Sequence, residues 1–170
     1  KLMTPYGGEV VNPIENMDVR FQGVNLAGTS SIDYSIDNGN SWTNIASGLN
    51  SSIKNYSWNI PNTIVSTRAK VRVTNGNDTS ISNAFSILRA PNGLIVDWIC
   101  IDSMQVSWNP VAGSIGYVAH RLGQEYMDSV GTTTQTSFVF KGAFHNNAEW
   151  ISISALDSAN HKSVRAKAIQ

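Results

Sequence analysis

Cysteine, charge and long apolar segments are all scarce in this sequence. The single cysteine, Cys100, excludes an intramolecular disulfide and a thiolate metal cluster, and its place in the apolar run 98–101 predicts a small buried side chain. Charged residues make up only 14%, with 12 basic and 12 acidic residues, so we expect no nucleic-acid partner. The apolar runs are too short to cross a bilayer, so we expect no membrane insertion.

Catalytic and metal-binding signatures are scarce as well. The three histidines, His120, His145 and His161, are far apart in sequence and are expected to be surface or loop residues rather than metal ligands. There is no G-x-S-x-G elbow, and most aspartates fall at inferred turns. Asp33 and Asp37 lie near asparagines but lack the alternation and the closing glutamate of a calcium loop. We therefore expect no enzyme activity, no cofactor and no metal.

Short stretches in which apolar and polar residues alternate run through the whole chain. Met17, Val19 and Phe21 show this pattern, and so do Ala69 and Val71. Residues two apart lie on the same face of a strand, so each stretch predicts a half-buried strand. No stretch keeps a helical period, and the predicted class is all-β.

The pattern restarts after a segment punctuated by proline and glycine at residues 89–93. With 170 residues, each half is large enough for one sandwich core. The sequence therefore predicts two antiparallel β-sandwiches in tandem, over residues 1–89 and 90–170.

A tight hairpin turn is predicted at residues 35–42, whose sequence is SIDNGNSW. Asn38 and Gly39 tolerate positive φ, and the Asp37 carboxylate can accept hydrogen bonds from N–H groups of the turn. Trp42 is expected to close the hairpin over its base, in core-like alternation. The S-x-D-x-G-x-x-W spacing resembles the Asp-box of sialidases and related β-propellers. That family uses the box as a folding motif, and a single copy predicts a structural turn rather than a propeller.

Four signatures in the first half resemble one kind of Ig-like module. They are Pro5-Tyr6-Gly7-Gly8-Glu9, the segment from Tyr34 to Trp42, Tyr56-Ser57-Trp58-Asn59-Ile60-Pro61, and Arg68-Ala69-Lys70-Val71-Arg72-Val73. Modules of this kind occur in very large surface and secreted proteins of bacteria that use the type IX secretion system. The resemblance implies an Ig-like sandwich with no chemistry of its own.

The second half resembles a fibronectin type III domain of the bacterial extracellular kind. The residues that carry this resemblance are the W-x-P-V-x-G stretch that begins at Trp108 and the following strand at residues 115–121. Trp108 is expected to anchor the core, with Met104, Val106 and Tyr117 on its face. Residues 161–169 are expected to form the last strand.

One position departs from that family. The place that usually holds a corner tyrosine carries Glu149, and the aromatic Trp150 follows it. A one-residue slip would reverse every side chain of this strand. Ile151, Ile153 and Ala155 make the better core row, so Trp150 is expected to point outward.

Two groups of residues are left as candidate sites. Trp98, Trp150 and Tyr126 fall outside the predicted core rows and are candidates for stacking on a sugar or for contacting a neighbouring module. A second group consists of serines that follow aspartate in a D-S-x pattern resembling the O-glycosylation signal of the same secreting bacteria, namely Ser103, Ser129 and Ser158.

These observations predict non-catalytic structural or adhesion modules of a larger bacterial protein, located extracellularly or on the outer cell surface. The expected partners are neighbouring modules of the same parent chain, together with cell-surface glycans or proteins. Two alternatives remain open. One is a carbohydrate-binding module that uses Trp98 and Trp150, and the other is a pair of accessory domains of an extracellular protease or glycosidase.

Overall fold

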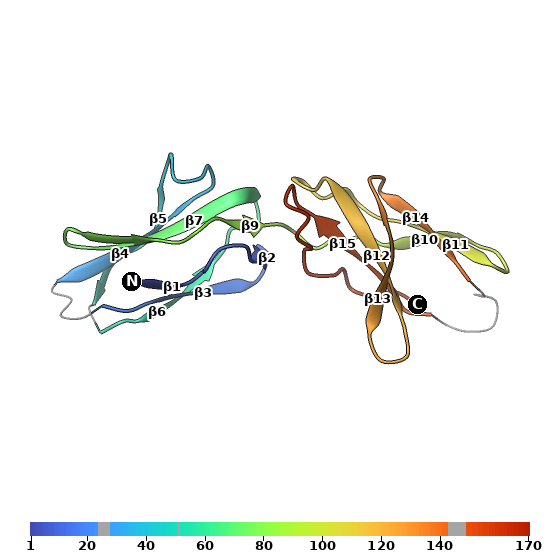
Figure 1. Cartoon of the computed structure of the whole chain (residues 1–170), viewed down its shortest axis with the longest axis horizontal. Coiled ribbons are helices and arrows are strands. Elements are labelled where there is room, and N and C mark those ends of the chain that lie inside the picture. Colours follow the sequence, from blue (N-terminus) through green and yellow to red (C-terminus); the bar gives the residue numbers. More distant parts are fainter. Residues whose placement is uncertain (24–27, 51, 143–148) are drawn as a thin grey trace. The chain divides into compact units, whose positions relative to one another are not determined.

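The computed structural model describes four stretches of the chain, residues 1–23, 28–50, 52–142 and 149–170. It divides into two compact units, Lys1–Ile87 and Leu88–Gln170 (Figure 1). Within the described residues every regular element is a β-strand, which confirms the predicted all-β class. The division falls two residues before the boundary expected between residues 89 and 90.

The first unit is built from nine strands in its described part: β1 (Leu2–Thr4), β2 (Val10–Val11), β3 (Asn16–Phe21), β4 (Thr29–Ser35), β5 (Thr43–Asn50), β6 (Asn55–Asn59), β7 (Ser66–Asn75), β8 (Asp78–Ile81) and β9 (Phe85–Ile87). One sheet has the strand order β1-β3-β6, and the other has the order β2-β9-β7-β4-β5, with β8 paired to β7. Strand β2 runs parallel to β9, whereas β3 pairs with its neighbours in antiparallel fashion.

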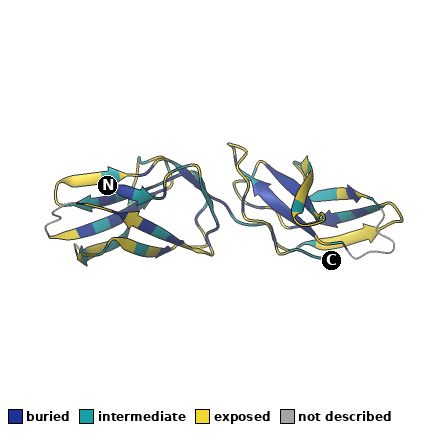
Figure 2. Cartoon of the chain, turned by 60° about the horizontal axis from the view of Figure 1, so that its bottom comes forward, coloured by how far each residue is buried: buried dark blue, intermediate teal, exposed yellow. Residues whose placement is uncertain are grey.

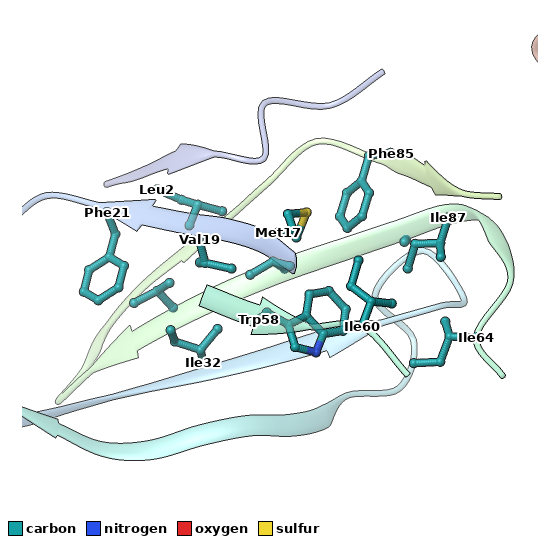
Figure 3. Packing of buried hydrophobic residues seen from close by; sticks show 13 residues of the cluster. Leu2, Met17, Val19, Phe21, Ile32, Trp58, Ile60, Ile64, Phe85 and Ile87 are labelled. Carbon is teal, nitrogen blue, oxygen red and sulfur yellow. The ribbon is translucent and has the colours of Figure 1, made fainter. Parts of the chain in front are cut away.

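Alternate side chains of these strands form the core of the first unit (Figure 3). Met17, Val19 and Phe21 on β3 are all buried, as their spacing predicts. The Trp58 ring is buried as well and lies 5.0 Å from the ring of Tyr34, centroid to centroid. Burial of these large apolar side chains between two sheets is the main stabilising term in a sandwich of this size.

The segment from Pro5 to Glu9 carries the chain from β1 in one sheet to β2 in the other. The Glu9 carboxylate accepts the N–H groups of Tyr6 and Gly7 at 2.5 and 2.6 Å. Gly7 has a φ of 111°, and a Cβ added there would lie 2.3 Å from the Cβ of Asn83. Only glycine fits this backbone conformation and this close approach. The first signature of the Ig-like module is therefore explained as a crossing between sheets.

Six strands form the second unit in its described part: β10 (Ile95–Ile99), β11 (Ser103–Ser107), β12 (Gly116–Leu122), β13 (Met127–Thr133), β14 (Ser137–Lys141) and β15 (Ile151–Leu156). The two sheets have the orders β10-β11-β14 and β13-β12-β15, and all of these pairs are antiparallel. Buried residues alternate with more exposed ones along β3, β7 and β11, whereas β9, β12 and β15 are buried along most of their length and β10 is exposed throughout (Figure 2).

Trp108 anchors the core of the second unit, as predicted. Its side chain is buried, and its ring meets that of Tyr117 edge to face, with 5.2 Å between centroids. The Tyr117 hydroxyl accepts the Val111 N–H at 3.0 Å and the Ser114 hydroxyl at 3.2 Å. One tyrosine thus contributes its ring to the core and fixes the loop before its own strand.

The start of β15 settles the orientation of Trp150. Ile151 and Ile153 are buried while Trp150 is 42% exposed, which confirms the outward orientation. The preceding residue, Glu149, places its carboxylate 2.8 Å from the Nε of Arg121. A half-buried ion pair therefore occupies the place where the resemblance implied a corner tyrosine.

The prediction that Cys100 is buried was wrong, because its side chain is exposed. Cys100 follows β10, an edge strand in which all five residues are exposed. The register of β10 shifts between Val96 and Trp98, so the strand does not keep one face on the core. An apolar run reads as buried in sequence, but an edge strand has no second neighbour to cover it.

The expected last strand, residues 161–169, is not regular. It runs alongside β15, with isolated bridges at Lys162 and Ile169 and with backbone hydrogen bonds of 2.8 Å from the Ser163 N–H to the Ala155 carbonyl and from the Ala166 N–H to the Ile153 carbonyl. Between them the Ser163 hydroxyl, rather than a backbone carbonyl, accepts the N–H of Ala155 at 2.9 Å. A side chain that takes the place of a ladder partner interrupts the strand.

Replacing Trp108 with alanine is expected to destabilise the second unit by about 3–5 kcal/mol, because a large cavity would remain in its core. The first unit should keep its own transition, since its core is separate. Differential scanning calorimetry of the whole chain measures both transitions. Trp98→Ala is the matched control, because Trp98 is 39% exposed and should leave both transitions in place. Loss of both transitions in Trp108→Ala would contradict two separate cores.

Candidate functional site

The hairpin tip between β4 and β5 has the geometry expected from its sequence. Asn38 and Gly39 have φ values of 66° and 96°. The Ser35 hydroxyl accepts the Gly39 N–H at 2.8 Å, and the Asp37 carboxylate accepts the N–H of Ser41 at 2.9 Å and its hydroxyl at 2.6 Å. These hydrogen bonds, above all the one from the Ser41 hydroxyl, hold the pKa of Asp37 well below its usual range. The carboxylate is thus used to close the turn.

Trp42 does not enter the core, contrary to its predicted alternation. Its ring lies against the guanidinium of Arg72, with 4.5 Å from the guanidinium carbon to the ring centroid. Arg72 also pairs with the buried Asp33 at 2.8 Å, and the Asn44 amide donates to the other Asp33 oxygen at 2.9 Å. Cation–π attraction therefore holds Trp42 outside the core, over an ion pair between β4 and β7.

These contacts bear on the weak calcium site considered for Asp33 and Asp37. Both carboxylates are bound by donors of the chain itself, which leaves them poorly placed to coordinate a cation. Across residues 1–23, 28–50, 52–142 and 149–170, no group of three or more His, Cys, Asp and Glu side chains could hold a metal ion. No helix in the same stretches is long and apolar enough to span a membrane.

The three candidate aromatic residues are all exposed, at 39% for Trp98, 42% for Trp150 and 75% for Tyr126. Trp150 and Tyr126 border the turn between β12 and β13, since the Leu122 N–H donates to the Trp150 carbonyl and the Gly123 N–H donates to the Tyr126 carbonyl. Trp98 lies on β10 in the other sheet. The structure therefore brings two of the three to one end of the second unit.

The three candidate serines lie at a strand start, in an edge strand and in a turn. Ser103 opens β11 and is half-buried, and its hydroxyl donates to the Asp102 carboxylate at 3.0 Å. Ser129 is exposed in the edge strand β13 and accepts a hydrogen bond from the Lys162 ammonium at 3.1 Å. Ser158 is exposed in the turn after β15. Glycosylation at these positions stays a prediction.

His120 is buried, so its expected surface position was wrong. Only 4% of it is exposed, and its Nε2 lies 3.1 Å from the Ser154 hydroxyl. Burial, together with the positive charges of Lys162 and Arg165, lowers the pKa of His120 to about 4. Its spacing on β12 does place it away from the core row, but residues that follow β15 cover that outer face. Strand periodicity cannot reveal such a cover.

The other two histidines differ from His120. His161 is exposed, and its Nδ1 lies 3.2 Å from the carboxylate of Asp157, which is fully buried. The Asp157 carboxylate also accepts the N–H groups of Ala159 and His161, both at 2.8 Å, so it caps the turn after β15. His145 lies outside the described residues.

Solved structures with the same fold include a segment of two fibronectin type III domains from chicken tenascin. It is 12% identical, the match covers 99% of this chain and 94% of that chain, and the TM-score is 0.53. A fibronectin type III domain of human collagen alpha-1(XX) is 18% identical over 48% of this chain and 81% of that chain, with a TM-score of 0.40. Chicken CNTN1 domains FN1–FN3 are 14% identical over 95% of this chain and 61% of that chain, with a TM-score of 0.43.

No protein-family model and no curated protein matches the sequence. At 12% identity, the likeness to the tenascin segment concerns the fold alone. The chain therefore has the fold of two β-sandwich domains of the fibronectin type III and Ig-like kind, in tandem.

Replacing Gly39 with valine is expected to destabilise the first unit by about 2 kcal/mol, because a β-branched residue resists positive φ. The added Cβ would also lie 3.3 Å from the Trp42 ring. Chemical denaturation followed by tryptophan fluorescence measures the change. Gly39→Asn is the matched control, since asparagine tolerates positive φ and should cost less stability. An unchanged midpoint in Gly39→Val would show that the turn has a different geometry.

The second unit is expected to lose stability as the pH falls from about 6.5 towards 4. The folded-state pKa of His120 is lowered to about 4 from an ordinary 6.5, so in this range the unfolded chain takes up a proton that the folded chain does not. Urea unfolding at several pH values measures this slope. We expect His120→Gln to reduce it and His161→Gln to retain it. Equal slopes in the wild type and both variants would contradict this assignment.

Proposed function

We propose that this chain supplies two non-catalytic structural or adhesion modules to a larger protein. The observation that carries the proposal is that the carboxylates considered for a calcium site, those of Asp33 and Asp37, have structural roles. Asp37 closes a turn, and Asp33 pairs with Arg72 beneath Trp42. Domains of this fold commonly act as spacers, and a mechanical role needs only independent, well-packed units.

We infer that the parent protein is a large bacterial protein, secreted or attached to the outer cell surface, and that the type IX system exports it. In this protein the Asp-box hairpin is a structural element. The support is the set of four signatures in the first half, of which Pro5–Glu9 forms the sheet crossing and residues 35–42 form the hairpin turn. Neighbouring modules of the same chain are the proposed partners, and cell-surface glycans or proteins are the targets in adhesion.

A carbohydrate-binding module is the second candidate. The exposed Trp150 and Tyr126 border one hairpin turn, and stacking on sugars requires exposed rings of this kind. Two rings make a small platform, and Trp98 lies in the other sheet. For this reason the spacer role is favoured. An accessory role beside an extracellular protease or glycosidase is compatible with either function, since such modules travel with many enzymes.

A glycan array screened with the intact chain separates these functions. The spacer proposal predicts no specific binding. Binding that disappears in Trp150→Ala and persists in Trp98→Ala would replace it with a carbohydrate-binding module. Assays with general peptide and glycoside substrates are expected to show no turnover. Hydrolysis that one serine or carboxylate substitution abolishes would overturn the non-catalytic role.

A further inference from the structure

An open groove of about 640 Å³ lies on the outer face of the sheet β13-β12-β15, within the second unit. Strands β12, β13 and β15 contribute His120, Ser129 and Ser154, and the segment after β15 contributes Lys162 and Arg165. These five residues define the His120 groove. The segment after β15 runs irregularly along the edge of β15, and the Lys162 side chain extends from it across the sheet to the Ser129 hydroxyl on the far strand, at 3.1 Å.

The charge of the His120 groove is positive. Lys162 and Arg165 both line it, and none of the described lining residues is acidic. Lys162 donates to the Ser129 hydroxyl, and within the described part of the chain neither cation forms an ion pair. In a chain with formal net charge zero, two adjacent cations without carboxylate partners are a local excess that favours an anion.

His120 supplies a second and independent indication. Its imidazole is only 4% exposed, its Nε2 is bonded to Ser154, and its Nδ1 has no hydrogen-bond partner in the described part of the chain. Buried polar atoms nearly always have a partner, and leaving one unmade is unfavourable. When the Ser154 hydroxyl donates to Nε2, Nδ1 carries the ring proton and lacks an acceptor. Nδ1 is closed to solvent whereas Lys162 and Arg165 are exposed, so an anion held by these two cations accepts the Nδ1 proton when the side chains that cover this atom move aside.

We propose that the His120 groove binds a tetrahedral oxyanion, phosphate or sulfate, either free or as a substituent on a larger molecule. Arg165 offers a planar fork of N–H donors and Lys162 offers a point charge, the two side chains that proteins use most for such ions. The Ser129 hydroxyl is the neutral donor at the rim. This site goes beyond a spacer role, because it gives the second unit a ligand of its own.

Nuclear magnetic resonance titration of the intact chain tests the site. Sodium phosphate and sodium sulfate are added separately, with sodium chloride adjusted to keep the ionic strength constant. We expect saturating shifts at His120, Ser129 and Ser154, with a dissociation constant of about 1–10 mM. The double variant Lys162→Gln/Arg165→Gln should weaken binding at least about tenfold. Lys167→Gln is the matched control, an exposed lysine of the same segment that does not line the groove, and it should bind as the wild type does.

Shifts that never saturate, or equal weakening in the double variant and in Lys167→Gln, would overturn the proposal. A measurement on the wild type keeps the test valid even where the double variant folds poorly. Bound sulfate favours the charged imidazolium, so the pKa of His120 should rise from about 4 in sulfate relative to chloride. An identical pKa in both salts would also overturn the proposal.

Methyl phosphate distinguishes the two sources of the ion. Affinity equal to that of inorganic phosphate supports a site open to a substituent on a larger molecule. Affinity about tenfold weaker supports a site for the free ion, because the methyl group then blocks one of the oxygens that the groove uses. Absence of binding by inorganic phosphate, sulfate and methyl phosphate alike would show that the groove holds no oxyanion.

Discussion

Strand register in both units is fixed by the burial of alternate side chains between two sheets. A slip of one residue would exchange the buried and exposed faces of a strand, so every apolar row must be in phase with its neighbours. Trp58 and Trp108 are the largest members of these rows, and each is paired with a tyrosine ring, Tyr34 and Tyr117. The loops and turns then adapt to the register. Tyr117 shows this directly, because its hydroxyl fixes the loop that precedes its own strand.

Two kinds of charged side chain can be distinguished: carboxylates that accept hydrogen bonds from the chain itself, and cations that do not form ion pairs within the described residues. Asp33, Asp37 and Asp157 are each bound by donors of the chain, at a sheet face or in a turn. Lys162 and Arg165 are different, because they line a groove with the buried His120 and, among the residues that the structure describes, neither forms an ion pair. The oxyanion site that we propose therefore lies in the second unit, whereas Asp33 and Asp37 of the first unit are engaged in its structure.

Local patterns predicted the strands of Met17 to Phe21, the glycine turn at residues 38–39 and the outward side chain of Trp150, because period and turn chemistry are local properties. The wrong predictions concern burial, which depends on segments that are distant in sequence. His120 was expected on the surface but is covered by a segment more than forty residues later, and Cys100 was expected inside but lies beside an uncovered edge strand. The His120 groove could not be predicted either, since it depends on the irregular course of residues 161–169. The only sequence signal was the pair of cations near the C-terminal end.

Forced extension of single molecules tests the central claim, that the chain consists of two independent mechanical modules. Two separate unfolding events are predicted, each releasing roughly 300 Å of chain, the extended length of one unit at about 3.5 Å per residue. A single event that releases roughly twice this length would contradict the account, because the halves would then share one cooperative structure.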